Sequence, residues 1–142
     1  MWKPWLDWLR SQSPFRPRSL GQRGEDAAAR FLRRLGYKIV ARQSRLRIGE
    51  LDIVAVDGRT VVFVEVRTRT DQQHGHPAET VDREKQRRLT RMALAYLKGH
   101  GLLNHAARFD VVAVTWAADA KQPQIEHFRD AFPAVGFDGM FS

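Results

Sequence analysis

The sequence predicts one mixed α/β domain, in which helices flank a central mixed sheet in the order αββ(β)αββ. Three observations lead to this prediction. Apolar residues recur at helical spacing over residues 20–35, the turn signal Asp57-Gly58 separates two strand-like segments, and residues 109–116 form a nearly continuous apolar run. A chain of 142 residues is long enough to bury one core.

The first helix has clear start and stop signals. Ser19 can cap it together with Gln22 in an S-x-x-Q capping box, and Gly36 stands where a helix usually ends. Residues 37–42 then have the composition of a strand, and the basic residues 42–47 are expected to form a loop.

The remaining elements follow from turn signals and periodicity. The predicted elements are hairpin strands at 49–56 and 60–67, a polar loop at 68–79, a helix with a basic outer face at 80–98, and strands at 109–116 and 124–128. Residues 1–18, rich in tryptophan and proline, are expected to form an arm, residues 19–130 the domain and residues 131–142 a tail.

The composition limits the partners, the metal ligands and the cellular location that we expect for this chain. The net charge is +8, and arginine supplies 19 of the 24 basic residues, which favours a polyanionic partner over a merely solvated cationic surface. The absence of cysteine excludes disulfides and thiolate metal sites, so a metal would sit on oxygen or imidazole. With no apolar run of about 18 residues and no secretion signal, we expect no membrane span and a cytoplasmic location.

A carboxylate cluster in the hairpin is the strongest chemical signal. Glu50 and Asp52 share one strand face, as do Glu65 and Arg67. A turn of two residues at Asp57-Gly58 or of four at Asp57 to Thr60 puts both sets on the same side of the hairpin, and the four-residue turn would place Asp52 opposite Glu65. Like charges so placed are destabilising, and the apolar run around Glu65 makes an unpaired charge costly. An arginine such as Arg67 or Arg69 on a solvent-facing surface would offset the charge, or a bound Mg²⁺ or Mn²⁺ would.

This region carries a family resemblance. Gly49-Glu50-Leu51-Asp52, a strand gap and Val64-Glu65-Val66-Arg67 resemble the PD-(D/E)XK signature of restriction-endonuclease-like and Holliday-junction-resolvase-like nucleases. With residues 21–25 and Arg108-Phe109-Asp110, the pattern over about residues 20–116 is similar to the YraN-like family of small bacterial proteins. The resemblance implies a metal-dependent phosphodiesterase fold, with Asp52, Glu65 and the Val66 carbonyl as ligands, assisted by Glu25 and Glu50.

One position departs from that signature, because Arg67 stands where the lysine is usual. Arginine stays protonated, so it would stabilise phosphate charge without accepting a proton. Lys85 would supply the missing amine if the second helix packs over the site, and a solvated lysine is the alternative. The Arg108–Asp110 pair is expected to be a surface ion pair.

The leading hypothesis is a Mg²⁺- or Mn²⁺-dependent endonuclease for branched or otherwise structured DNA. A catalytically silent nucleic-acid-binding module and a protein-interaction adaptor using the tryptophan arm are the alternatives, and a homodimer is implied only by the resemblance to resolvases. The basic residues expected to contact the phosphate backbone are Arg42, Arg45, Arg47, Arg69, Arg83, Lys85, Arg87 and Arg88.

Overall fold

The computed structural model describes residues 18–70 and 81–136. Nearly all of the expected arm, most of the expected loop at 68–79 and the end of the tail lie outside these residues. The elements are the helices α2 (Leu20–Arg34) and α3 (Arg83–Gly99) and the strands β1 (Lys38–Leu46), β2 (Gly49–Asp57), β3 (Thr60–Thr70), β4 (Ala107–Trp116) and β5 (Gln124–Phe132). Their order confirms the predicted mixed α/β fold.

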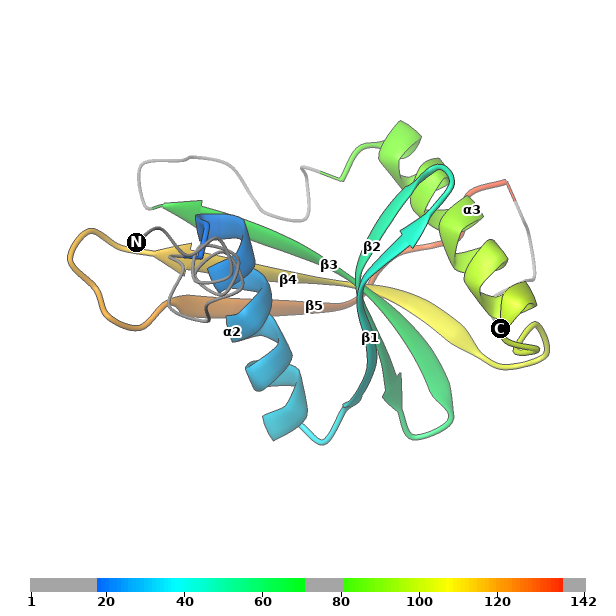
Figure 1. The fold of residues 1–142 in the computed structure, drawn as a ribbon, viewed down its shortest axis with the longest axis horizontal. Coiled ribbons are helices and arrows are strands. Elements are labelled where there is room, and N and C mark those ends of the chain that lie inside the picture. The colour runs from blue at the N-terminus through cyan, green and yellow to red at the C-terminus, as the bar shows by residue number, and fades with distance from the viewer. Residues whose placement is uncertain (1–17, 71–80, 137–142) are drawn as a thin grey trace, which may run out of the picture.

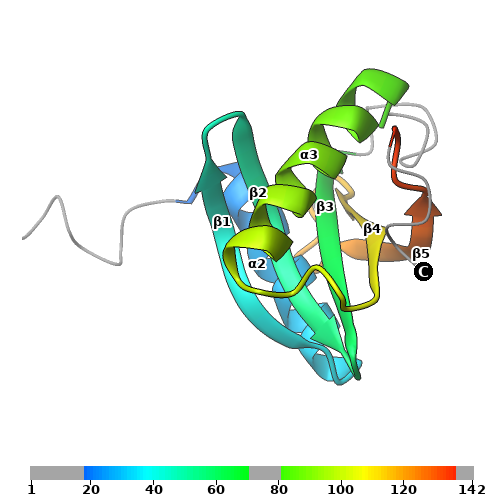
Figure 2. The ribbon, with the colours of Figure 1, turned by 90° about the vertical axis from the view of Figure 1, so that its right-hand side faces the viewer.

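The five strands form one sheet in chain order, β1-β2-β3-β4-β5 (Figure 1). Strands β3 and β4 are parallel and the other neighbouring pairs are antiparallel. Helix α3 is the crossover between the parallel strands and lies across one face of the sheet, with α2 on the other (Figure 2). The domain is therefore three layers, helix on sheet on helix.

Helix α2 begins as predicted. The Ser19 hydroxyl accepts a hydrogen bond from the Gln22 amide, and the Gln22 side chain accepts one from the Ser19 amide. Gly24 then lets the helix approach β3, because a methyl group at this position would overlap the side chain of Thr68. Helix α3 starts three residues later than predicted, at Arg83, since the carboxylate of Asp82 caps it by accepting the Lys85 amide.

The prediction that the basic residues 42–47 form a loop is wrong for every residue except Arg47, because the others belong to a strand. Strand β1 continues to Leu46, and Arg42, Ser44 and Arg45 pair with Ile53, Leu51 and Glu50 of β2. A basic edge strand is stable here because one edge of its ladder is satisfied by β2 while the charged side chains reach solvent. The turn that joins β1 to β2 consists of only Arg47 and Ile48.

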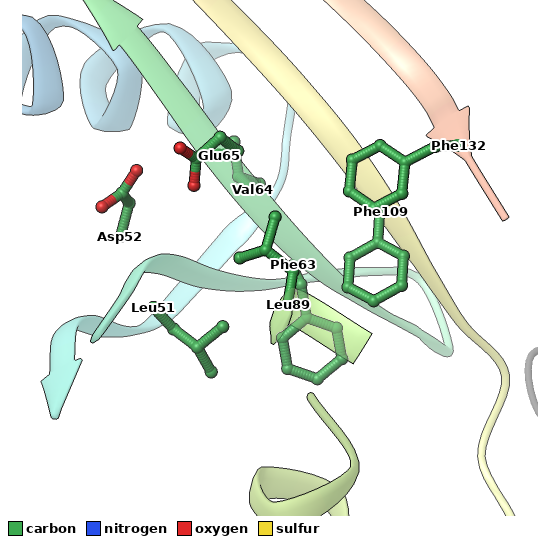
Figure 3. Close-up of a pocket in the computed structure, with 8 residues that line it drawn as sticks. All are labelled: Leu51, Asp52, Phe63, Val64, Glu65, Leu89, Phe109 and Phe132. Atoms are coloured by element: carbon green, nitrogen blue, oxygen red, sulfur yellow. The ribbon is translucent and has the colours of Figure 1, made fainter. Parts of the chain in front are cut away.

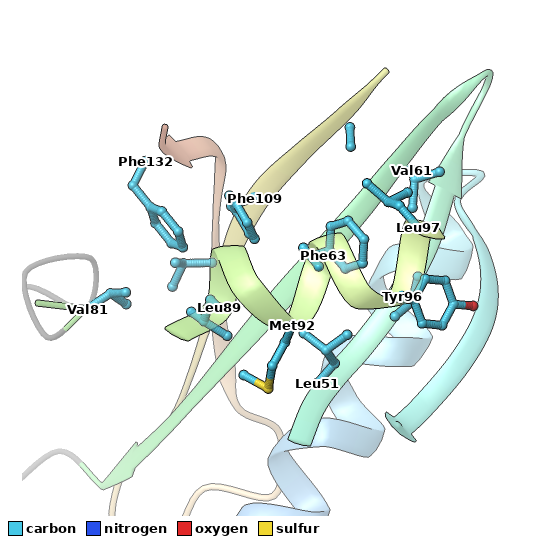
Figure 4. Packing of buried hydrophobic residues seen from close by; sticks show 14 residues of the cluster. Leu51, Val61, Phe63, Val81, Leu89, Met92, Tyr96, Leu97, Phe109 and Phe132 are labelled. Carbon is cyan, nitrogen blue, oxygen red and sulfur yellow. The ribbon is translucent and has the colours of Figure 1, made fainter. Parts of the chain in front are cut away.

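The core has two halves, one on each sheet face. Alternation along β3 sends Val61 and Phe63 toward α3 and Val62 and Val64 toward α2. Figure 4 shows the α3 half, where Phe63 packs among side chains of that helix and of β4. It also includes Phe132, which lies beyond residue 130, where the domain was expected to end. These two clusters fix the positions of the strands that carry the acidic residues.

The expected surface pair Arg108–Asp110 is wrong. Asp110 is fully buried, and its carboxylate lies 3.0 Å from Arg108 Nε and 2.8 Å from His127 Nε2. It also accepts the backbone amide of Asp130 at a register shift between β4 and β5. Burial raises the pKa of Asp110, but the hydrogen bonds from His127, Arg108 and Asp130 outweigh it and hold the pKa below its usual value.

Within the described part of the chain, neither helix has the length and apolar character needed to cross a membrane.

Candidate active site at the β2–β3 divergence

The site lies where two paired strands separate. The hairpin register is the one predicted for a four-residue turn, with Asp57 opposite Thr60 and Ile53 opposite Val64. The next pair in that register would be Asp52 with Glu65, but the ladder ends at Ile53. The Asp52 carboxylate instead accepts the Val66 amide at 2.9 Å, which satisfies a backbone donor next to the divergence.

Two carboxyl groups face each other at this point. Figure 3 shows the side chains of Asp52 and Glu65 directed toward one another above an apolar floor that includes Leu51 and Phe63. Burial, the negative charge of Glu65 and a hydrogen bond to it raise the pKa of Asp52 to about 7, against the opposing effect of the Val66 amide. Asp52 therefore keeps its proton up to about neutral pH.

Lys85 supplies the counter-charge. Its Nζ lies 2.6 Å from Glu65 Oε1, whereas Arg67 Nε lies 3.8 Å from the same oxygen. Glu65 is buried and the Lys85 side chain is about one-quarter exposed, so the amine reaches the carboxylate from the rim of the site. Helix α3 thus packs over the carboxylates. The sequence analysis expected Lys85 to supply the missing amine on this condition.

A cavity of about 200 Å³ opens beside these groups. One wall is the end of the β1–β2 hairpin and the other is the first half of α3. Its lining consists of Ile48, Gly49, Glu50, Asp52, Glu65, Lys85, Arg88, Leu89 and Met92. The residues from α3 follow helical spacing of three and four, and this periodicity could have identified the wall from sequence. Ile48 and Met92 were missed because neither carries a chemical signal.

The two other acidic residues are placed differently. Glu25 is buried on α2, where its carboxylate receives hydrogen bonds from Arg42 at 3.2 Å and Gln43 at 3.3 Å. Its charge adds the smallest of the effects that raise the pKa of Asp52. Glu50 lines the cavity and lies 3.9 Å from Arg45. No group of three or more acidic or histidine side chains gathers around one point in residues 18–70 and 81–136.

The arginines expected to contact nucleic acid fall into two groups. Arg69 is buried, and Arg42 is engaged by Glu25 and by Asp26, whose Oδ1 lies 2.6 Å from Arg42 Nη2. The others are exposed on the two sides of the cavity. They are Arg45 and Arg47 on the β1–β2 hairpin and Arg83, Arg87 and Arg88 on α3.

Comparison with known proteins identifies the family. The model of the uncharacterised protein family UPF0102 matches residues 24–114, which span both carboxylates and Lys85. The chain belongs to the UPF0102 family. This confirms the YraN-like resemblance read from the sequence.

Individual relatives in UPF0102 are similar over most of their length. A UPF0102 protein of Rhodopirellula baltica is 45% identical over 98% of this chain and 85% of its own. One from Geobacter sulfurreducens is 52% identical over 80% of this chain and 88% of its own, and one from Rhodococcus jostii is 48% identical over 80% and 96%. The names of these relatives state no activity, so function rests on the site.

Proposed function

We propose that this UPF0102 protein is a metal-dependent phosphodiesterase that cuts nucleic acid, with branched or otherwise structured DNA as its expected substrate. One observation carries the proposal. Two carboxyl groups, Asp52 and Glu65, face each other at a strand divergence beside an open cavity, and the amine of Lys85 lies 2.6 Å from one of them. A purely structural ion pair would need only one carboxylate.

The donor set fits a hard divalent cation. Asp52 and Glu65 offer carboxylate oxygens, and a cavity of about 200 Å³ leaves room for the water that Mg²⁺ and Mn²⁺ retain. Glu50, which lines the cavity, would act through such a water. Glu25 would first have to leave Arg42, and Val66 contacts Asp52 through its amide. When bound, the ion would supply Lewis acidity at the phosphate and lower the pKa of water.

The cations of the chain have separate tasks in this proposal. Arg67 is permanently charged, so it stabilises negative charge that develops on the phosphate. Lys85 holds Glu65 in place from α3, and its amine stands close enough to the carboxylates to assist proton transfer at the attacked phosphate. The exposed arginines on both sides of the cavity, such as Arg45 and Arg88, would bind the flanking phosphates.

A silent nucleic-acid-binding module is the second candidate. It is favoured by the arginine at position 67 and by the engagement of Glu25 with Arg42. Within residues 18–70 and 81–136, Glu50 is then the one further acidic side chain that lines the cavity with Asp52 and Glu65. Such a module would bind DNA through the same arginines without needing an ion at the carboxylates. The homodimer implied by resemblance and the adaptor role of the tryptophan arm stay predictions.

The test is cleavage of labelled four-way junction, flap, single-stranded and linear duplex DNA with Mn²⁺, Mg²⁺ or chelator. The variants are Asp52→Asn and Glu65→Gln, with Glu84→Gln on the exposed surface of α3 as the matched control. We expect metal-dependent cutting that both site variants abolish and the control retains. DNA binding without cutting, unchanged by either site variant, would support the silent module instead.

A further inference from the structure

The tip of the β1–β2 hairpin carries an exposed apolar side chain. Leu46 pairs with Gly49, so Arg47 and Ile48 alone form the turn. Ile48 is 45% exposed, one of five large apolar residues in the described chain that project into solvent. Isolated exposed apolar residues are common on proteins, so the case for Ile48 depends on its surroundings.

The turn is unusual for its length. Two-residue hairpin turns favour Asn-Gly or Gly-containing pairs, because one or both residues adopt a positive φ. Neither Arg47 nor Ile48 has a positive φ, and the residue directly after them, Gly49, has a φ of 156°. The backbone of the turn therefore accepts a large β-branched side chain at position 48, although turns more often carry small polar residues.

The base of the turn is held firmly. Leu46 packs against the α3 half of the core, and Gly49 lies so close to α3 that a Cβ atom there would be 3.0 Å from the Met92 sulfur. The residues on both sides of the turn, Leu46 and Gly49, are thus packed against the domain, and only the turn itself projects into solvent. Ile48 projects from a fixed support, which a side chain needs if it is to press into a partner.

The surroundings of the tip match a nucleic acid. Arg47 beside it is exposed, and the Arg45 side chain is 87% exposed. Ile48 also lines the same cavity as Asp52 and Glu65. An apolar group between cations, next to groups that would act on a phosphodiester, has the chemistry of the wedges that proteins insert between stacked bases.

We propose that Ile48 is a wedge that enters a base step of DNA next to the phosphate at the cavity, while Arg45 and Arg47 hold the flanking backbone. The inference rests on the proposed function and assigns a residue to the recognition of the branched DNA expected there. Opening a stacked step in continuous duplex costs free energy, whereas strand continuity is interrupted at a branch point and a step there opens at lower cost. The wedge therefore favours branched DNA over linear duplex, by about tenfold in affinity.

The experiment measures base unstacking separately from cutting. Four-way junction and duplex DNA carry the fluorescent base 2-aminopurine at successive positions, and its emission rises when it loses its stacked neighbour. All proteins carry Asp52→Asn, so that the DNA stays intact with Mg²⁺ present. Ile48→Ala removes the wedge, Ile48→Met keeps an apolar one, and Val40→Ala removes an equally exposed apolar side chain of β1 outside the cavity lining.

We expect emission to rise at one position near the branch, to be lost in Ile48→Ala and to persist in the other two variants, with thermal unfolding unchanged. The tenfold preference for the junction should fall to about twofold in Ile48→Ala. A rise that survives in Ile48→Ala, no rise at any position, or no DNA binding overturns the wedge. Cutting without Ile48-dependent unstacking leaves the proposed nuclease standing, and unstacking without cutting by the unmodified protein leaves only the wedge.

Discussion

Replacing Asp52 with asparagine should stabilise the fold at alkaline pH. The pKa of Asp52 is raised from its usual 3.8 to about 7, mainly by burial and by the charge of Glu65. Between these values the folded protein keeps a proton that the unfolded chain has lost, so stability falls as pH rises through this window. Asparagine can still accept the Val66 amide and can donate to Glu65, as protonated Asp52 does.

The size of the effect follows from the same values. A gap of about three pH units corresponds to about 4 kcal/mol at 1.36 kcal/mol for each. Lys85 and water in the cavity screen part of the repulsion, so we expect Asp52→Asn to raise the free energy of unfolding by about 2 kcal/mol at pH 8.5. At pH 4 the two proteins should differ little, because Asp52 is then protonated in the folded wild type.

Urea denaturation of both proteins from pH 4 to 9, with chelator present, measures this difference. Mg²⁺ added at pH 8.5 should then stabilise the wild type and leave Asp52→Asn unchanged. A stability difference that stays constant across the pH range would refute the reasoning, because it would mean that Asp52 is ionised throughout. Glu84→Gln, an exposed change on α3, is the control and should follow the wild type at every pH.

Three further changes test other parts of the structure. Lys85→Met should lower the rate of cleavage about 100-fold and should change the Mn²⁺ concentration needed for half-maximal cutting, because Glu65 loses its counter-charge. Activity equal to that of the wild type would show that Lys85 has no role in the reaction. Asp110→Asn should cost about 3 kcal/mol in urea denaturation at pH 7 and less at pH 3, because a lowered pKa gives stability that is lost as pH falls. Gly24→Ala should cost about 2 kcal/mol through overlap with Thr68, and a shift below about 0.5 kcal/mol would contradict the close packing.

Much of the site was accessible from the sequence because its signals are local. The turn signal at Asp57-Gly58 allowed a two-residue or a four-residue turn, and the four-residue turn from Asp57 to Thr60, which the structure has, brings Asp52 and Glu65 to corresponding positions. The divergence of the strands at that point was not accessible. At that point the Val66 amide donates to the side chain of Asp52 and not to a backbone carbonyl of β2, and no pattern of residue types predicts this hydrogen bond.

The errors came from contacts between distant segments. The arginines in β1 suggested a loop, because a strand is predicted from alternating polar and apolar side chains and the charged residues of β1 interrupt that pattern. The pairing with β2 shows that the segment is a strand. Asp110 looked like half of a surface pair with Arg108, since the residue that accounts for its burial, His127, is 17 positions away on β5. The spacing of apolar residues predicts the secondary structure of a segment, but it does not predict which distant residues pack against that segment.

The parallel pairing of β3 with β4 sets an order in which the site can assemble. Strands β1, β2 and β3 are joined by tight turns, so their contacts are close in sequence and cheap to form. Strand β4 can pair only after the chain has made the crossover through α3. Lys85 reaches Glu65 only when that helix docks, so the Asp52–Glu65 end of the hairpin lacks its counter-charge until then. We expect the fast-forming nucleus to lie at the Asp57 end of the hairpin, with the chemistry-bearing end among the last parts of the domain to become ordered.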